Sequence, residues 1–166
     1  MMKSGLIAFC LVGLLTTNVS ATELPKESVL PLSLAVKAAQ AAVDKCLADG
    51  YRVSAAVVDR GGNVRALLRN DDAGPHTVDS SRKKAYSSAS LKRSTAELGA
   101  LIAKMPAVQG LQHMNEHILL LGGGLPIEMN GEVVGGIGVG GAPGGHLDEA
   151  CAAAGLNSIG AASKNK

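Results

Sequence analysis

A run of glycines near the C-terminal end of the chain limits its fold more than any other feature. Residues 132–156 read EVVGGIGVGGAPGGHLDEACAAAGL, and Gly136, Gly138 and Gly141 spell G-x-G-x-x-G before a helical pattern. In a dinucleotide-binding fold this motif belongs to a parallel βαβ unit, with an acidic residue about 20 positions further on. Residues 156–166 contain no acid and are too few for a second strand. The spacing therefore argues against a nucleotide site.

The same glycines fit a different role, in which they let main chain approach main chain. Gly135, Gly136 and Gly138 would thin a strand so that another segment of backbone can pack closely against it. The glycines that follow would form a loop that leads into the last helix, whose N-terminus favours negative charge. We predict an anion-binding loop that contains Gly140, Gly141, Gly144 and Gly145.

Hydrophobic periodicity and turn residues predict one α+β domain over residues 32–166, preceded by an extended arm at 22–31. Asn130-Gly131 is the strongest hairpin signal in the chain, and Ser94 with Glu97 forms a candidate capping box. The order α-β-β-α-α-β-β-β-α favours a central antiparallel sheet with helices packed on it. The expected helices cover residues 32–49, 77–92, 95–105 and 146–154, and the five expected strands cover 51–59, 64–70, 118–121, 126–129 and 132–139.

The N-terminal segment has the order of a secretory signal peptide, which we assign to residues 1–21. Lys3 gives a positive start, residues 6–15 are apolar, and small residues precede a cleavage site after Ala21. The apolar run is too short for a permanent membrane span, although an uncleaved anchor is the alternative interpretation. We expect a periplasmic or secreted protein.

Charge and aromatic content argue against nucleic acid as a partner. Removal of the signal leaves fifteen basic and fourteen acidic residues, because Lys3 is its only charged residue. Tyr51 and Tyr86 are then the only aromatic residues, whereas proteins that grip bases by stacking need more. The resulting net charge of +1 also gives no strong attraction to anionic lipid.

Two cysteines remain after removal of the signal, Cys46 and Cys151. In an oxidising compartment they could form one disulfide if the first and last helices are neighbours. Two buried, unpaired thiols are the alternative.

The segment 113–117 spells H-x-x-E-H, which on a helix would place His113 and His117 on one face as zinc ligands. A catalytic site needs a third ligand, and no second long helix downstream supplies a glutamate. Gly110 and the strand expected from Ile118 also leave little room for a helix. We therefore predict no metal site here and interpret both as surface histidines.

Several motifs together resemble the GlcG/HbpS family (DUF336-like) of haem-binding or haem-degrading-type domains. They are residues 59–63 (DRGGN), 84–86 (KAY), 124–127 (GLPI), and Asp148-Glu149 with residues 151–155 (CAAAG), and the similarity extends from the first helix to Leu156. The resemblance implies an α-β sandwich, profilin- or roadblock-like, that assembles into oligomers. Some members bind haem, and others have no settled role.

If the family's haem binding extends to this chain, an axial ligand is needed. The candidates are His76, His113, His117 and His146, and the run Arg82, Lys83 and Lys84 could pair with haem propionates, although such a run is also typical of a solvated helix face. The lack of Phe and Trp after the signal peptide argues against haem, because a porphyrin usually binds between aromatic walls, although a shallow or intersubunit site would tolerate it.

Three hypotheses follow. The first, which we favour, is an exported, oligomeric haem-binding protein that captures, buffers or senses haem, and not an enzyme. The second is an enzyme or binding protein for a small anionic metabolite that uses the glycine-loop pocket. The third is an accessory module that binds another protein.

Overall fold

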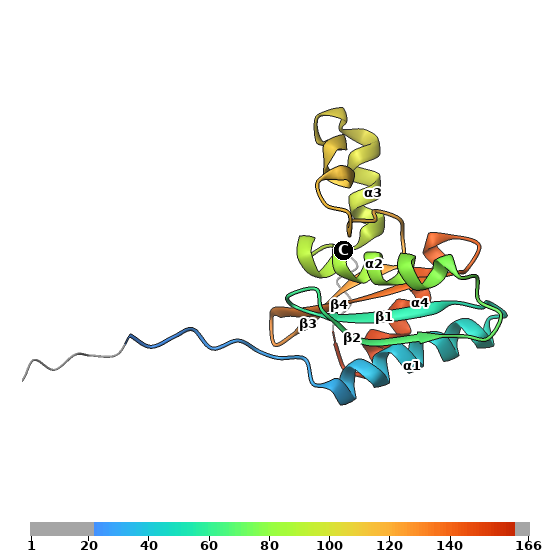
Figure 1. The fold of residues 1–166 in the computed structure, drawn as a ribbon, viewed down its shortest axis with the longest axis horizontal. Helices are drawn as coiled ribbons and strands as arrows, with labels where there is room; N and C mark the ends of the chain where they lie inside the picture. Colours follow the sequence, from blue (N-terminus) through green and yellow to red (C-terminus); the bar gives the residue numbers. More distant parts are fainter. Residues whose placement is uncertain (1–21, 162–166) are drawn as a thin grey trace, which may run out of the picture.

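A four-stranded antiparallel sheet forms the middle layer of the protein in the computed structural model, which describes residues 22–161 (Figure 1). Its strands run in the order β2-β1-β4-β3, and every neighbouring pair is antiparallel. The predicted α+β class and antiparallel sheet are confirmed, and the glycine-rich segment lies between antiparallel neighbours. The strands are β1 (Ser54–Asp59), β2 (Val64–Arg69), β3 (Gly124–Met129) and β4 (Glu132–Gly140).

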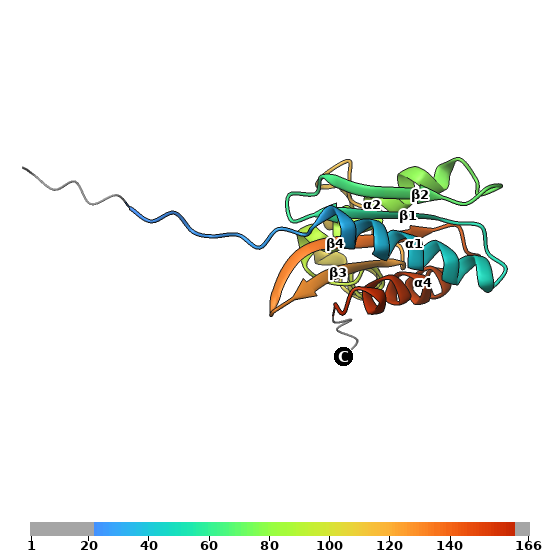
Figure 2. The same ribbon diagram turned by 90° about the horizontal axis from the view of Figure 1, so that it is seen from below.

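Helices cover both faces of the sheet. Helices α1 (Leu32–Ala48) and α4 (Gly145–Ser158) lie side by side on one face, as the view from below shows (Figure 2). Helix α2 (His76–Leu91) covers the other face, across β4 and β1. Helix α3 (Thr95–Lys104) and the 3-10 helix η1 (Pro106–His113) stand above α2, away from the sheet (Figure 1).

The two sides of the sheet are packed differently. On the α1–α4 side the core is built from alanine, valine, leucine and isoleucine, with Ile137 and Leu156 fully buried. On the α2 side the buried apolar cluster is small, consisting of Ala56, Val58, Ala85 and Ala89. Helix α2 lies close to the sheet because the residues in contact are alanine, serine and glycine.

The predicted fifth strand at residues 118–121 is wrong, and its side chains belong to a separate cluster. Ile118 and Leu120 pack with Leu98 of α3, outside the sheet. The amide of Leu119 donates to Ser87 Oγ of α2 at 2.8 Å. In a strand this amide would instead bond to the backbone of a neighbouring strand. An apolar run by itself could not distinguish a strand from a connection buried between helices.

The last helix also differs from its prediction, because it continues through Gly155 to Ser158. A Cβ at Gly155 would lie 2.7 Å from Ala38 O, so this glycine allows α4 to approach α1 closely and does not end the helix. The predicted cap of α3 is confirmed, since Ser94 Oγ accepts a hydrogen bond from the Glu97 amide at 3.1 Å.

The N-terminal arm is extended over residues 22–31 and reaches the domain at Leu30, which is buried. The signal peptide assigned to residues 1–21 and the last five positions of the assigned domain, 162–166, lie outside the described residues. Within residues 22–161, no helix combines the length and apolar character needed to cross a membrane.

Candidate functional site

Two glycines of β4 bring α2 into direct contact with the sheet. A Cβ at Gly136 would lie 2.3 Å from Ala85 O, and one at Gly138 would lie 2.2 Å from Ser81 O. Both neighbours are backbone atoms of α2, so only glycine fits at these positions. This packing places Lys84 of α2 beside the end of β4 and the start of α4.

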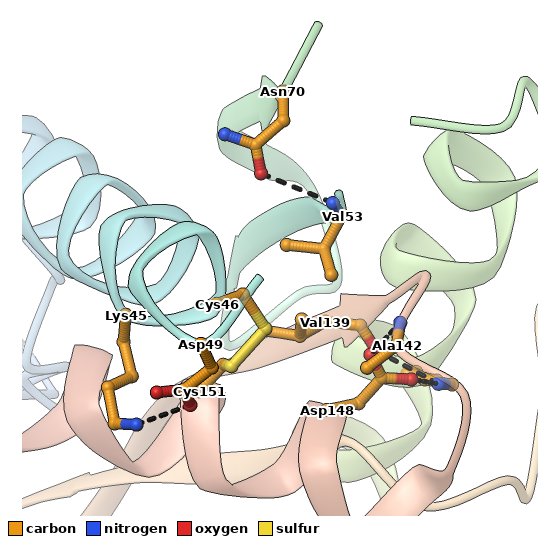
Figure 3. Close-up of a disulfide and its surroundings, with 10 residues drawn as sticks. Lys45, Cys46, Asp49, Val53, Asn70, Val139, Ala142, Asp148 and Cys151 are labelled. Carbon is orange, nitrogen blue, oxygen red and sulfur yellow. Dashed lines mark hydrogen bonds and ion pairs between the residues drawn. A yellow bond between two sulfur atoms is a disulfide. The ribbon is translucent and has the colours of Figure 1, made fainter. Parts of the chain in front are cut away.

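Lys84 forms a buried ion pair with Asp148 in the first turn of α4. Their Nζ and Oδ2 atoms are 2.8 Å apart, and the two side chains are only 6% and 4% exposed. Lys84 Nζ also donates to Val139 O at 2.9 Å, and Asp148 Oδ1 accepts from the Ala142 amide at 3.0 Å. Figure 3 shows Asp148 beside Ala142 and Val139.

Two opposing effects act on the Asp148 carboxyl. Burial raises its pKa, and the ammonium of Lys84 and the amides of Ala142 and Gly141 counteract this by stabilising the carboxylate. Gly123, with φ +116°, lies against the pair, and a Cβ there would be 2.6 Å from Asp148 Cβ. The pair therefore fixes the base of the glycine loop to α2.

Two pockets adjoin the contact between Gly122 and Gly145, and both glycines line each of them. The first, which we call the loop pocket, has a volume of about 310 Å³ and is formed by His76, Ser80, Lys84, Leu121, Gly122, residues 140–145 and Asp148. The second, the helix pocket, has a volume of about 400 Å³ and is formed by Ala96, Gly122, Gly145, His146, Glu149 and Ala150. The predicted anion-loop glycines, Gly140, Gly141, Gly144 and Gly145, all line the loop pocket.

Glu149 places a carboxyl group in the wall of the helix pocket. Its Oε2 atom is buried and has no hydrogen-bond partner among the described residues. Burial raises the pKa of Glu149, the Gly123 amide lowers it by hydrogen bonding, and the nearby Glu97 carboxylate raises it further. The pocket therefore contains an acceptor that lacks a partner.

His76 and His146 occupy equivalent places at the two pockets. Each lies at the start of a helix, is exposed, and folds its ring back over the glycine two positions earlier. A Cβ at Gly74 would be 2.6 Å from His76 Cε1, and one at Gly144 would be 2.8 Å from His146 Cε1. Neither imidazole forms a hydrogen bond or ion pair within residues 22–161.

The other two histidines lie away from these pockets. His113 is exposed at the end of η1, and His117 follows it after a turn, so they do not share a helical face. The ring of His117 packs edge-on against Tyr86 at 5.3 Å, with Arg82 Nη1 3.5 Å from its Nδ1. Within residues 22–161, no group of three or more His, Cys, Asp and Glu side chains is arranged to hold a metal ion.

The structure separates the three basic residues that the sequence presented as one run. Arg82 and Lys83 both pair with Asp79, at 2.9 and 3.0 Å, on the accessible side of α2. Lys84 points inward to Asp148, so it does not belong to a solvated face. Asp148, Glu149 and Ser80 were not among the predicted site residues. Asp148 pairs with Lys84, 64 positions away in the sequence, and nothing local in the sequence shows that Glu149 and Ser80 lie at pockets.

A disulfide joins Cys46 of α1 to Cys151 of α4, with a Cα–Cα distance of 5.5 Å (Figure 3). Cys151 lies three residues after Asp148, about one turn along α4. The covalent link therefore holds the helix that carries Asp148, His146 and Glu149 against the core.

Known proteins resemble this chain in sequence over most of its length. Residues 30–157 match the family described as "Haem degrading protein HbpS-like". An uncharacterised 15.0 kDa protein of Citrobacter freundii, from the dhaT–dhaS intergenic region, is 38% identical over 115 residues, which are 69% of this chain and 81% of that protein.

Solved structures share the fold. A double mutant of HbpS from Streptomyces reticuli is 43% identical, with a TM-score of 0.76 over 85% of this chain and 95% of its own. Protein ORFY of Klebsiella pneumoniae is 32% identical, with a TM-score of 0.78 over 87% and 100%. A PduOC–haem complex is 24% identical, with a TM-score of 0.75 over 82% and 99%, and at this identity it supports the fold alone.

Proposed function

The chain belongs to the HbpS-like family of haem-degrading-type proteins, and from this premise we propose that it binds haem in the helix pocket with His146 as the axial ligand. The observation that carries this assignment is an exposed imidazole without a hydrogen-bond partner among the described residues, at the edge of a 400 Å³ pocket. Histidine is a common axial ligand of haem iron.

The walls of the helix pocket fit a flat, apolar macrocycle. Ala96, Gly122, Gly145 and Ala150 present small side chains or bare backbone, so a planar group could lie close to them. The pocket is open and has small wall residues, which agrees with the absence of Phe and Trp from the sequence that follows the proposed signal peptide. When bound, haem would supply iron redox and ligand-binding chemistry, while the protein supplies the ligand and the apolar walls.

Glu149 would act on the polar side of the same pocket. Its buried Oε2 accepts no hydrogen bond from the described residues, so a protonated carboxyl could donate to a bound ligand, and a carboxylate could accept. Gly144 leaves room for the ring of His146, because a Cβ at position 144 would lie 2.8 Å from His146 Cε1. These residues bind and orient; no covalent step is assigned to them.

The remaining histidines fit this role less well. His117 is engaged with Arg82 and Tyr86, and His113 lies on η1 outside both pockets. His76 lies in the adjoining loop pocket and is the second candidate. Arg82 and Lys83, already paired with Asp79, lie outside both pockets and are poor partners for propionates at this site.

We further propose that the protein is exported and forms homo-oligomers, in which it captures, buffers or senses haem. The signal-like order of residues 1–21 and a disulfide in the folded domain both favour an oxidising compartment. Apolar side chains exposed on α1 and the arm, Leu24, Val29, Leu32, Val36 and Leu47, would suit a contact between copies. N-terminal sequencing of the mature protein and light scattering after size exclusion test these two points.

The test of the haem proposal is a haemin titration followed in the Soret region. We expect the wild-type protein and His113→Ala to give the same saturable red shift, and His146→Ala to lose it. Loss in His76→Ala with no change in His146→Ala would move the ligand to the loop pocket and refute the assignment of His146. No saturable shift with the wild-type protein would refute haem binding itself.

A further inference from the structure

We propose that the loop pocket is a binding site for a carboxylate monoanion, held by Lys84, Ser80 and the N-terminus of α4. Such a site gives the buried ion pair a role beyond packing. Its parts come from three elements that are distant in the sequence: α2, the glycine loop and α4.

The ammonium of Lys84 can serve a ligand as well as its protein partners. A lysine ammonium has three donors. One is directed to Val139 O at 2.9 Å and one to Asp148 Oδ2 at 2.8 Å. Since Lys84 also forms part of the pocket wall, its third donor is available to an acceptor in the cavity.

The first amides of α4 supply a second set of donors. The amides of Leu147 and Asp148 both bond to Gly144 O, as helical amides do. Those of Gly145 and His146 lie at the open end of the helix, where N–H groups lack intrahelical partners and face an incoming anion. The imidazole of His76 and the hydroxyl of Ser80 complete the polar side of the pocket. The hydroxyl donates to Thr77 O at 3.3 Å, and a ligand would take the place of that long hydrogen bond.

The charge of the pocket favours one negative charge over two. The Asp148 carboxylate already balances Lys84, so the remaining positive potential comes from the helix terminus and the loop amides. A phosphate dianion would lie beside a buried carboxylate with too little positive charge to offset the repulsion. A carboxylate, with one charge and four acceptor positions, matches these donors better.

The volume of about 310 Å³ and the apolar residues Leu121, Ala142 and Pro143 suit a ligand with a short carbon skeleton. Two sources of such a carboxylate are consistent with this geometry. One is a free small organic acid. The other is a propionate of a haem bound in the helix pocket, because the two pockets share Gly122 and Gly145; this second source rests on the proposed haem function.

The experiment has one arm for each source, with a blocking variant and a matched control on the same helix. Ser80→Leu places a side chain into the loop pocket, and Ser90→Leu places the same side chain on the exposed part of α2. In the first arm, acetate, pyruvate and lactate are titrated into haem-free, ¹⁵N-labelled protein. In the second arm, haemin is compared with haem dimethyl ester, which lacks free propionates.

We expect a positive result in at least one arm. In the first, one of the acids gives saturable shifts at the amides of residues 141–146, retained in Ser90→Leu and absent in Ser80→Leu. In the second, haemin binds roughly tenfold more tightly than the ester, as for loss of one charge-assisted hydrogen bond, and Ser80→Leu removes that preference. If Ser80→Leu does not fold, Ser80→Ala and His76→Ala must each weaken the response.

The proposal is overturned if none of the three acids saturates and the ester binds as tightly as haemin. It is also overturned if the response survives Ser80→Leu in folded protein. Saturation by an acid in a protein that shows no haemin binding would refute the haem function and leave the carboxylate site supported, so the two failures are distinguishable.

Discussion

The contact between β4 and α2 makes Gly138→Ala the most informative single substitution in this protein. The added Cβ would lie 2.2 Å from Ser81 O and 2.4 Å from Ala85 N, whereas ordinary contacts begin near 3.4 Å. Both neighbours are backbone atoms in the middle of a helix, so a side-chain rotation cannot relieve the overlap. Helix α2 would have to move away from the sheet by about 1 Å.

The size of the effect follows from what this movement disrupts. Overpacking in a closely packed core costs about 1–3 kcal/mol, and more where the surroundings are rigid. A gap of up to 1 Å also forfeits a quarter to a half of the dispersion energy along the separated surface. We therefore expect Gly138→Ala to lower the free energy of unfolding by about 3 kcal/mol, out of the roughly 5–15 kcal/mol typical of a domain.

Urea denaturation followed by circular dichroism measures this loss, and Gly110→Ala is the matched control. Gly110 lies in η1 with open space around its Cβ position, so alanine there should be neutral or stabilising by about 0.4–1 kcal/mol. The movement of α2 would also pull Lys84 away from Asp148, so the carboxylate response should weaken with stability. A Gly138→Ala protein within about 0.5 kcal/mol of wild type would refute the close-packing argument.

Two further predictions concern stability. Replacement of both cysteines, Cys46→Ala with Cys151→Ala, should lower the free energy of unfolding by roughly 2–5 kcal/mol, because the bond closes a loop with a sequence separation of 105; an unchanged urea midpoint after the replacement would contradict this. Glu149→Gln should increase the free energy of unfolding at neutral pH by about 1 kcal/mol, which a rise in melting temperature would show, because it removes a buried charge with an unpaired oxygen. The pKa of Glu149 is raised above 4.5 in the folded state, so the folded wild type binds this proton more tightly than the unfolded chain does. The stability of the wild type therefore falls as the pH rises from 4.5 through the folded-state pKa. The difference between Glu149→Gln and wild type should therefore disappear below about pH 4, and a difference that persists there would show that charge is not its cause.

The sequence predicted the architecture well where local signals are strong. Asn130-Gly131 indicated the hairpin that joins β3 and β4, Ser94 indicated the start of α3, and periodicity located α1 and α2 within one or two residues. It failed for residues 118–121, where an apolar run packs against α3, and for Gly155, which the helix includes because α1 lies against it. In both places the neighbour that decides the conformation is distant in the chain.

The candidate site shows the same division. The glycine pattern determined that a thin strand and a loop would lead into the last helix, because glycine is required where backbone approaches backbone. Nothing in the sequence favoured any one of the four histidines, or any one residue of the basic run 82–84, as a ligand-binding residue. Only the tertiary structure decided that His76 and His146 lie at two adjoining pockets, and that Lys84 turns inward to Asp148, 64 residues away. Local patterns fix local conformation, whereas the pairing of charges in a core depends on which helix the sheet brings within hydrogen-bond distance.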